Sequence, residues 1–468
     1  MDPIILSRLQ FALTASFHFI YPPLSIGLGL FLVVIGIIYL RTRDPKWRQL
    51  SFFWVKVYGL VFAVGVATGI VQEFEFGTNW ANYSRFVGNI FGSLLAAEGV
   101  FAFFLEGGFL GLMLFGGNRL GPRLWVLATA LVAIGAHFSA LWIVMANSWM
   151  QTPAGYELQQ TAIGTQAFMT TFPEVVFTPS FIPRILHTLA ASWITGGALM
   201  LSVSAWYLLK GRFVEQSRSL IKVVLPIFIV IAILQLILFG AEQAVEVADN
   251  QPVKLAAMEG VWEDTACAPM TLVGWVNVAG QQTMGIKVPC LLSFLAYGDF
   301  NATVKGLNSF PPDTWPPIQL TFQSYHFMVA MGGIFIAIGL IGGLFFLWKR
   351  RLWQHPLPLW LFVISVFLAE FATIAGWWTA EFGRQPWIVW ELLRTVDAGS
   401  PILAGYQVLL SVLMFVALYA LLFALFLYLL NEKIQHGPES LEDVEAVAVD
   451  SLPDSFRDIF SRQRPRAG

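Results

Sequence analysis

Nine long apolar stretches occupy most of the chain, and they constrain its fold more than any other feature. A helix needs about 20 apolar residues to cross a bilayer. Nine stretches reach this length, at residues 11–40, 52–78, 91–117, 124–148, 181–209, 220–241, 320–348, 358–382 and 404–430. Only 12% of the 468 residues are charged, against about 25% in soluble domains. The sequence therefore predicts an all-α integral membrane protein with about nine transmembrane helices.

The basic residues between these stretches predict the orientation. Lys and Arg are frequent in alternate connections, at residues 41–48, 119–123, 210–222 and 349–351, and they are sparse in the others. Short cytoplasmic loops carry the excess of Lys and Arg in membrane proteins. We therefore expect the N-terminus outside and the C-terminus in the cytoplasm.

The same pattern divides the chain into four parts. Residues 1–241 hold the first six helices, and residues 320–430 hold the last three. Between them, residues 242–319 form an outside loop, and loops of this length are usually functional or disordered. Residues 431–468 are polar and are predicted to form a flexible cytoplasmic tail.

The two cysteines of the chain, Cys267 and Cys290, both fall in the outside loop. An oxidising compartment permits a disulfide there. The sequence leaves open whether the two pair.

Several ionisable or metal-binding side chains fall near the outer ends of the apolar stretches. They are His18, Glu98, His187, Met328 and Glu381. At a rise of about 1.5 Å per residue, all five are expected within roughly 15 Å of the outer surface. Ionisable groups are costly at membrane depth unless they are paired, ligated or hydrated. The clustering therefore predicts one shared functional site.

Histidine and methionine are familiar axial ligands of haem iron, and a Met/His pair recurs in electron-transfer haems. Each of these residues also has a structural interpretation without haem. A histidine can be a hydrogen-bonded interior residue, and a methionine can be flexible core packing. We interpret His137 as structural. His326, two residues before Met328, is either a competing ligand or a partner of a haem propionate.

Two carboxylates in the third stretch, Glu98 and Glu106, are eight residues apart. In an α-helix this spacing is about 80° around the axis and 12 Å along it, so both can face one interior seam. Buried carboxylates of this kind can take up and release protons. We favour a proton relay over two structural hydrogen-bond partners. Glu73 and Glu75 we interpret as interfacial.

Seven short motifs follow one another along the chain. They are SRLQFA at 7–12 with His18, EFGTNW at 75–80, the helix with Glu98 and Glu106, HT at 187–188, WYLLKG at 206–211, KLAAME at 254–259 and GRQPW at 383–387. In this order they resemble subunit I of the cytochrome bd family of quinol oxidases. The resemblance covers nearly the whole chain, and nine helices with an outside N-terminus are also the topology of that family.

The resemblance implies a haem ligand at four positions. His187 and Met328 match the axial ligands of a low-spin haem b beside the quinol site. Glu381 matches the ligand of a high-spin haem b. His18 matches the ligand of the oxygen-reactive haem, which is a haem d or a further haem b.

Other positions match supporting residues of the family. Trp377 matches an aromatic residue between haems, and Arg384 matches a partner of a propionate, because a guanidinium suits a carboxylate. Lys254 and Glu259 match residues of the quinol loop, with Glu259 as proton acceptor, although taken alone they form an ordinary amphipathic turn. The two carboxylates of the third helix match the end of a proton path.

Two departures from the family pattern stand out. The outside loop is short, as in the short-loop members that include cyanide-insensitive oxidases. His326 stands where some relatives have arginine, so the propionate contacts and the potential of the low-spin haem can differ.

The implied function is that of a terminal respiratory oxidase in a bacterial inner membrane. Quinol would be oxidised at the periplasmic face, and O2 would be reduced to water at a di-haem site with cytoplasmic protons. This reaction generates a proton-motive force without pumping. The family's enzymes contain a second subunit, and some contain a small single-helix subunit.

Two alternatives belong to other functional classes. A haem quinone dehydrogenase would pass electrons to a protein acceptor instead of O2. A proton-coupled secondary transporter would use buried Glu and His without haem, but such proteins usually have internal repeats and broken helices, and neither is visible in the sequence.

Overall fold

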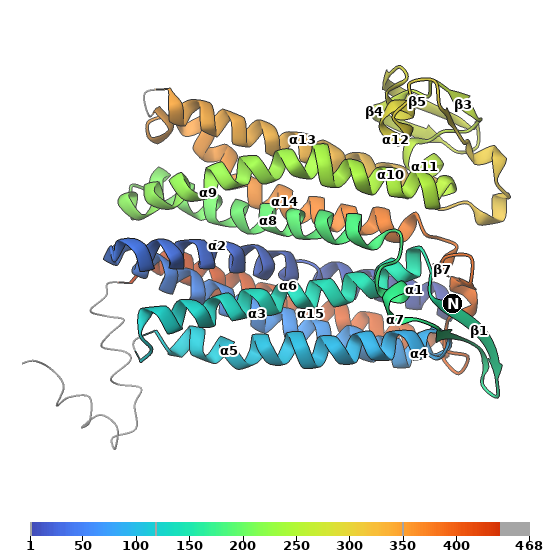
Figure 1. The fold of residues 1–468 in the computed structure, drawn as a ribbon, viewed down its shortest axis with the longest axis horizontal. Helices are drawn as coiled ribbons and strands as arrows, with labels where there is room; N and C mark the ends of the chain where they lie inside the picture. The colour runs from blue at the N-terminus through green and yellow to red at the C-terminus, as the bar shows by residue number, and fades with distance from the viewer. Residues whose placement is uncertain (1, 118, 349–350, 440–468) are drawn as a thin grey trace, which may run out of the picture.

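The computed structural model describes residues 2–117, 119–348 and 351–439 (Figure 1). Within these ranges, nine helical spans are long and apolar enough to cross a membrane. They are Pro3–Thr42, Pro45–Thr78, Ala81–Phe115, Pro122–Gln151, Phe181–Leu209, Val214–Asn250, Ile318–Leu347, Pro356–Phe382 and Gly405–His436. The predicted number of spans is confirmed. The helices extend beyond the apolar stretches because helical hydrogen bonding continues into their polar ends.

The nine spans run alternately in opposite directions and form one elongated bundle (Figure 1). One end, here called the loop end, carries the N-terminus and the segments 152–180, 260–317 and 383–404. The other, here called the basic end, carries the short connections that hold most of the Lys and Arg. The charge asymmetry predicted from the sequence is therefore an asymmetry between the two ends of the bundle.

The first span consists of two helices, α1 (Pro3–His18) and α2 (Tyr21–Thr42). The sequence at this break is Tyr21-Pro22-Pro23, and prolines are tolerated in the first turn of a helix but interrupt a helix interior. The predicted continuous stretch at 11–40 is therefore divided. His18 is the last residue before the break.

Two further spans contain a π-helical turn. Glu98–Phe103 lies between α4 (Ala81–Ala97) and α5 (Phe104–Phe115). Gln235–Phe239 lies between α9 (Val214–Leu234) and α10 (Gly240–Asn250). Such turns are rare and occur frequently at functional sites. Both π-helical turns are therefore candidate positions for functional residues.

The remaining spans are single helices, α3 (Pro45–Thr78), α6 (Pro122–Gln151), α8 (Phe181–Leu209), α13 (Ile318–Leu347), α14 (Pro356–Phe382) and α15 (Gly405–His436). Helices α2 and α8 approach each other closely at Gly27 and Gly196. A Cβ atom at either glycine would clash with the backbone of the other helix. Two glycines are thus required where these helices cross.

The loop end adds structure that an all-α prediction omits. Four two-stranded sheets occur in the described part of the chain. They pair β1 (Tyr156–Thr161) with β2 (Gly164–Met169), β3 (Thr265–Ala266) with β6 (Thr303–Val304), β4 (Met270–Asn277) with β5 (Gln282–Val288), and β7 (Trp387–Val389) with β8 (Leu393–Arg394). Short helices α7 (Phe172–Val176), α11 (Pro252–Glu259) and α12 (Leu291–Tyr297) lie among them.

The outside loop differs from the prediction at its start. Helix α10 continues to Asn250, and α11 follows directly, so residues 242–259 are almost entirely helical. The rest of the loop is closed by a disulfide between Cys267 and Cys290. Of the predicted tail, α15 extends to His436, and residues 440–468 lie outside the described residues.

Candidate functional site

A cavity of about 540 Å3 opens between α8, α10, α11, α13 and α14. Five residues identified in the sequence line it: His187, Lys254, Glu259, Met328 and Trp377. Its volume lies within the range of about 300–1,000 Å3 that is typical of ligand and cofactor sites. Residues far apart in the sequence are thus brought together around one buried space.

The two candidate axial ligands come from different helices. His187 is six residues into α8, and Gln235 of the second π-helical turn approaches its Nδ1 at 3.2 Å. Met328 is on α13, and its Sδ packs against Gly376 of α14, where an added Cβ would lie 2.9 Å away. An imidazole and a thioether in one cavity form a donor set that suits haem iron.

Buried guanidinium groups provide a test of whether this space fits a haem. Arg184 lines the cavity with a relative exposure of 8%, and Arg384 near it is 3% exposed. Among the described residues, Nε of Arg184 and both Nε and Nη1 of Arg384 have no hydrogen-bond partner. Guanidinium groups pair with carboxylates in a bidentate manner. Unpaired N–H groups here therefore fit the propionates of a haem.

Arg184 was not identified from the sequence. It is three residues before His187, near the loop end of the apolar helix α8, and an arginine within a membrane span is energetically costly, which marks it as a candidate functional residue. Its Nη2 donates to Oδ1 of Asn147. The position of an arginine within an apolar stretch was the feature of the sequence that could have identified it.

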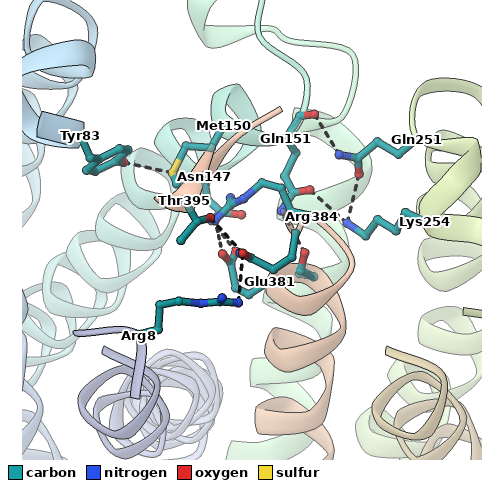
Figure 2. Close-up of polar contacts among 12 residues, drawn as sticks. Arg8, Tyr83, Asn147, Met150, Gln151, Gln251, Lys254, Glu381, Arg384 and Thr395 are labelled. Atoms are coloured by element: carbon teal, nitrogen blue, oxygen red, sulfur yellow. Dashed lines mark hydrogen bonds and ion pairs between the residues drawn. The ribbon is translucent and has the colours of Figure 1, made fainter. Parts of the chain in front are cut away.

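Lys254 lies in a polar network that Figure 2 shows. Its Nζ donates to Oε1 of Gln151 at 3.0 Å and to Oε1 of Gln251 at 3.1 Å. Nε2 of Gln151 in turn donates to the backbone oxygen of Ala380 at 3.2 Å. Burial, together with the charge of Arg184, lowers the pKa of Lys254. The ammonium group is therefore held at the cavity wall and gives up its proton more readily than an exposed lysine.

Glu259 is 2% exposed, and in the described part of the chain neither of its carboxyl oxygens has a well-aligned hydrogen-bond partner. Burial raises its pKa to about 7, and Tyr325 and Thr271 oppose this only in part. The amphipathic-turn interpretation is therefore wrong. Helix α11 packs against α13, and its residues from Val253 to Glu259 are all buried.

Glu381 and Arg384 form the ion pair that their spacing suggests (Figure 2). Oε1 of Glu381 also accepts a hydrogen bond from Nδ2 of Asn147 at 3.0 Å. Next in the GRQPW motif, Oε1 of Gln385 accepts from Arg8 at 3.2 Å and from Thr395 at 2.9 Å. Arg384 is thus paired with Glu381 through Nη2, whereas its Nε and Nη1 have no partner among the described residues.

His18 belongs to a second group of residues. Its Nδ1 lies 2.9 Å from Oγ1 of Thr68 on α3. The next residue, Phe19, lines the cavity and stacks on Trp377 with ring centroids 5.4 Å apart. One aromatic contact therefore connects the surroundings of His18 with the cavity.

Glu98 and Glu106 both face α6. Ser139 donates to Oε1 of Glu98 at 2.7 Å, and Tyr58 donates to Oε1 of Glu106 at 2.8 Å. Glu106 also packs on Gly135, four residues before Ser139. The shared seam predicted from the sequence is present. The π-helical turn reduces the rotation between the two carboxylates below the α-helical value.

The predicted single site is resolved into two adjoining groups. His187, Met328 and Trp377 surround the cavity, whereas His18 and Glu98 contact α3 and α6. Counted along the helices, Thr68 and Ser139 lie ten and twelve residues before the ends of α3 and α6, so they are about 15 and 18 Å from the loop end. The depth of Ser139, the partner of Glu98, exceeds the roughly 15 Å that was expected, and the contacts do not form one cluster.

Three other interpretations can be compared with the structure. His326 directs Nε2 to the Thr271 carbonyl at 2.7 Å and Nδ1 to the Phe322 carbonyl at 2.8 Å, and it is not among the residues that line the cavity. Nε2 of His137 accepts a hydrogen bond from Trp193 at 2.9 Å, in agreement with a structural role. Glu75 lies three residues from the end of α3, where an interfacial residue was expected, but it is buried there with an exposure of 2%.

The nine spans and the residues around the cavity are those expected of an integral membrane protein that binds haem. A family model described as cytochrome bd terminal oxidase subunit I matches residues 6–438. The chain belongs to this family. It is therefore a subunit of a quinol-oxidising terminal respiratory oxidase, a multi-pass protein of the bacterial inner membrane.

Individual relatives agree with this assignment. The chain is 35% identical to the cytochrome bd-II ubiquinol oxidase subunit 1 of Escherichia coli (strain K12), over 94% of this chain and 98% of the relative. It is 36% identical to the cytochrome bd ubiquinol oxidase subunit 1 of Bacillus subtilis (strain 168), over 94% and 95%. It is 30% identical to a putative cytochrome bd menaquinol oxidase subunit I of the same organism, over 95% and 100%.

Among solved structures, the chain is similar to the bd oxidase of Geobacillus thermodenitrificans. The TM-score is 0.87 at 28% identity, with 93% of this chain and 99% of that chain covered. The named relatives include both ubiquinol and menaquinol oxidases, so the names leave the quinol open.

Proposed function

We propose that quinol is oxidised at the loop end, where Lys254 and Glu259 line the cavity beside His187 and Met328. The observation that carries this proposal is that one buried space contains both a haem-type ligand pair and two titratable groups. Electrons and protons leave a quinol together, so its oxidation needs an electron acceptor and a proton acceptor in one place. The cavity offers residues for both.

Four residues would hold the haems. His187 and Met328 would bind the low-spin haem b, Glu381 the high-spin haem b, and His18 the oxygen-reactive haem. Bound there, the haems supply the redox-active iron for electron transfer and for reduction of O2 to water. Arg384, together with Arg184, would neutralise propionates. Trp377 would fill the space between macrocycles, because it stacks on Phe19 directly after His18.

Glu259 would accept a proton of the quinol. Its pKa of about 7 lets it take up a proton at neutral pH and pass it on. Lys254 would orient the quinol oxygen by hydrogen bonding, since Gln151 and Gln251 accept two of the three N–H bonds of its ammonium group and fix its position. These protons would be released at the loop end, which we place on the periplasmic side because the Lys and Arg residues lie at the other end.

Protons for water would come from the cytoplasmic side. The candidate haem ligands lie near the loop end, so the protons must cross most of the membrane through a polar seam. Glu106 and Glu98, with Tyr58 and Ser139 as their partners, form such a seam about 12 Å long. Each charge moved against the potential is worth about 2.3 kcal/mol per 100 mV. The enzyme would thus build a proton-motive force without pumping.

We further propose that the chain functions with subunit II of the oxidase as a heterodimer, and with a small single-helix subunit if one is present. Each of the four parts of the chain would have its own role. Residues 1–241 and 320–430 would hold haems and the proton path, residues 242–319 the quinol, and residues 431–468 would be a cytoplasmic tail.

Proteoliposomes containing the purified oxidase provide the test. Quinol addition should consume O2 and acidify the medium on the loop-end side, with one proton released per electron. An uncoupler should abolish the acidification but not the O2 uptake. More than one proton per electron would indicate pumping, and quinol oxidation without acidification would place both proton reactions on one side.

A further inference from the structure

A further carboxylate lies deep in the bundle, and it is neither among the residues that line the cavity nor part of the Glu98–Glu106 seam. Glu370 is fourteen residues from the start of α14 and twelve from its end, so it lies about 18–21 Å from each end of the helix. In the described ranges, neither of its carboxyl oxygens has a hydrogen-bond partner, and both are shielded from solvent. No role assigned above accounts for it.

Two phenol groups accompany this carboxylate. Tyr21, at the start of α2, is 0% exposed, and Tyr419 of α15 is 3% exposed. The Tyr21 phenol interacts electrostatically with both Glu370 and Tyr419. Within the described part of the chain, both hydroxyl groups are buried without a hydrogen-bond partner. Trp377, two helical turns after Glu370 on the same face of α14, stacks on Phe19, two residues before Tyr21, with ring centroids 5.4 Å apart. Helices α2, α14 and α15 thus each bring one unpaired polar group to this region of the bundle.

Aromatic rings pack against the two phenol groups. Phe17 stacks on Tyr419 at a centroid distance of 4.3 Å and meets the edge of Tyr21 at 5.7 Å. Phe426 meets Tyr21 at 5.2 Å. Burying an unpaired polar group among aromatic rings costs free energy, because the group loses its hydrogen bonds to water. Buried waters typically satisfy polar groups of this kind, so the cluster has the composition of a small hydrated site.

The cluster borders the surroundings of His18. Tyr21 follows His18 by three residues, and its Cβ would lie 3.2 Å from a Cβ at Gly65, one helical turn from Gly69, against which His18 packs. On the other side, Tyr419 interacts electrostatically with Glu75. Polar groups therefore extend from the middle of α14 to the residues around His18.

We propose that Glu370, Tyr21 and Tyr419 form an internal proton-binding site that holds water and supplies protons to the oxygen reaction beside His18. This inference rests on the proposed reduction of O2 near that histidine. Only O–H bonds form and break. The carboxyl group of Glu370 gives its proton to a bound water, the phenols relay hydrogen bonds, and a proton from the basic end replaces the one lost.

Redox-difference infrared spectroscopy of the purified oxidase tests the proposal. The wild-type spectrum should contain a carboxylic acid C=O band that shifts in D2O. Glu370→Gln should lose this band, and Tyr21→Phe should shift it by removing a neighbouring hydroxyl group. The matched control is Glu242→Gln, an exposed carboxylate of α10, which should leave the band unchanged.

Two outcomes would overturn the proposal. The first is a carboxyl band that is unaltered in Glu370→Gln, and the second is a wild-type spectrum without any D2O-sensitive carboxyl band. If Glu370→Gln fails to assemble, Tyr21→Phe and Tyr419→Phe decide, and an unshifted band in both contradicts the site. The CO-difference spectrum and O2 uptake of the wild type test the oxidase function separately, so the two failures are distinguishable.

Discussion

The raised pKa of Glu259 predicts a strong pH dependence of quinol oxidation. Only the deprotonated carboxylate can accept a quinol proton. With a pKa of about 7, the carboxylate fraction is roughly 1% at pH 5 and roughly 90% at pH 8, whereas a glutamate with the ordinary value of about 4.3 would be roughly 80% deprotonated at pH 5. Because the pKa is raised, activity is lost as the pH falls through 7.

The measurement is kcat/KM for a soluble quinol between pH 5 and pH 8, which reports ionisations of the free enzyme. We expect an acid limb with a fall of about 10²-fold across this range, against less than about 2-fold for an unperturbed carboxyl group. Glu259→Gln should lower the rate and remove the limb. Glu263→Gln, an exposed glutamate of the same loop, should retain both.

A flat profile in the wild type would refute this reasoning, because it would mean that Glu259 does not titrate in the rate-determining step. An acid limb that persists in Glu259→Gln would assign the proton acceptor elsewhere. Haem spectra of each variant show whether the protein has assembled, so a loss of activity is not confused with a loss of fold.

Three further substitutions test other parts of the site. Met328→Leu should remove the low-spin haem spectrum, whereas Met331→Leu, a buried control on the same helix, should leave it intact; an unchanged spectrum in the first variant would contradict the ligand assignment. Glu106→Ala should abolish turnover or slow it heavily with haem spectra preserved, and unaffected turnover would refute the proton path. Arg184→Leu should lower the midpoint potential of the low-spin haem in a redox titration. The expected loss is roughly 1–2 kcal/mol, the Coulomb energy of a unit charge about 10 Å away at an effective dielectric constant of 20, and an unchanged potential would mean that Arg184 does not contact a propionate.

The bundle itself was predictable because a bilayer imposes length and composition on each span. Nine apolar stretches gave nine spans, and the Lys and Arg residues indicated which connections share an end. The shared seam of Glu98 and Glu106 followed from helical spacing alone. These are consequences of local sequence and of the membrane.

Features that depend on contacts between helices were not predictable in this way. The break after His18 and the π-helical turn at Glu98 replace helices expected to be continuous. Glu75 lies near a helix end, as expected, but it is also buried, and Gln10 of α1 approaches its Oε1 at 3.4 Å. Position along one helix does not reveal which neighbour covers it.

The loop was the least predictable region. Helix α11 has the composition of an amphipathic turn, but tertiary packing buries it and thereby changes the chemistry of Lys254 and Glu259. Arg184 was not predicted, because it belongs to none of the motifs and is not a haem ligand. Its position in an apolar span, three residues before His187, was nevertheless visible in the sequence. A buried charge is better sought by its position in a span than by its membership of a motif.

Optical spectra of the purified oxidase show whether this chain carries haems for quinol-driven reduction of O2. We expect low-spin haem b bands in the reduced-minus-oxidised spectrum and a CO-reactive high-spin haem in the CO-difference spectrum. A haem spectrum without CO binding would contradict reduction of O2 by this protein. The absence of any haem band would contradict the assignment of His18, His187, Met328 and Glu381 altogether.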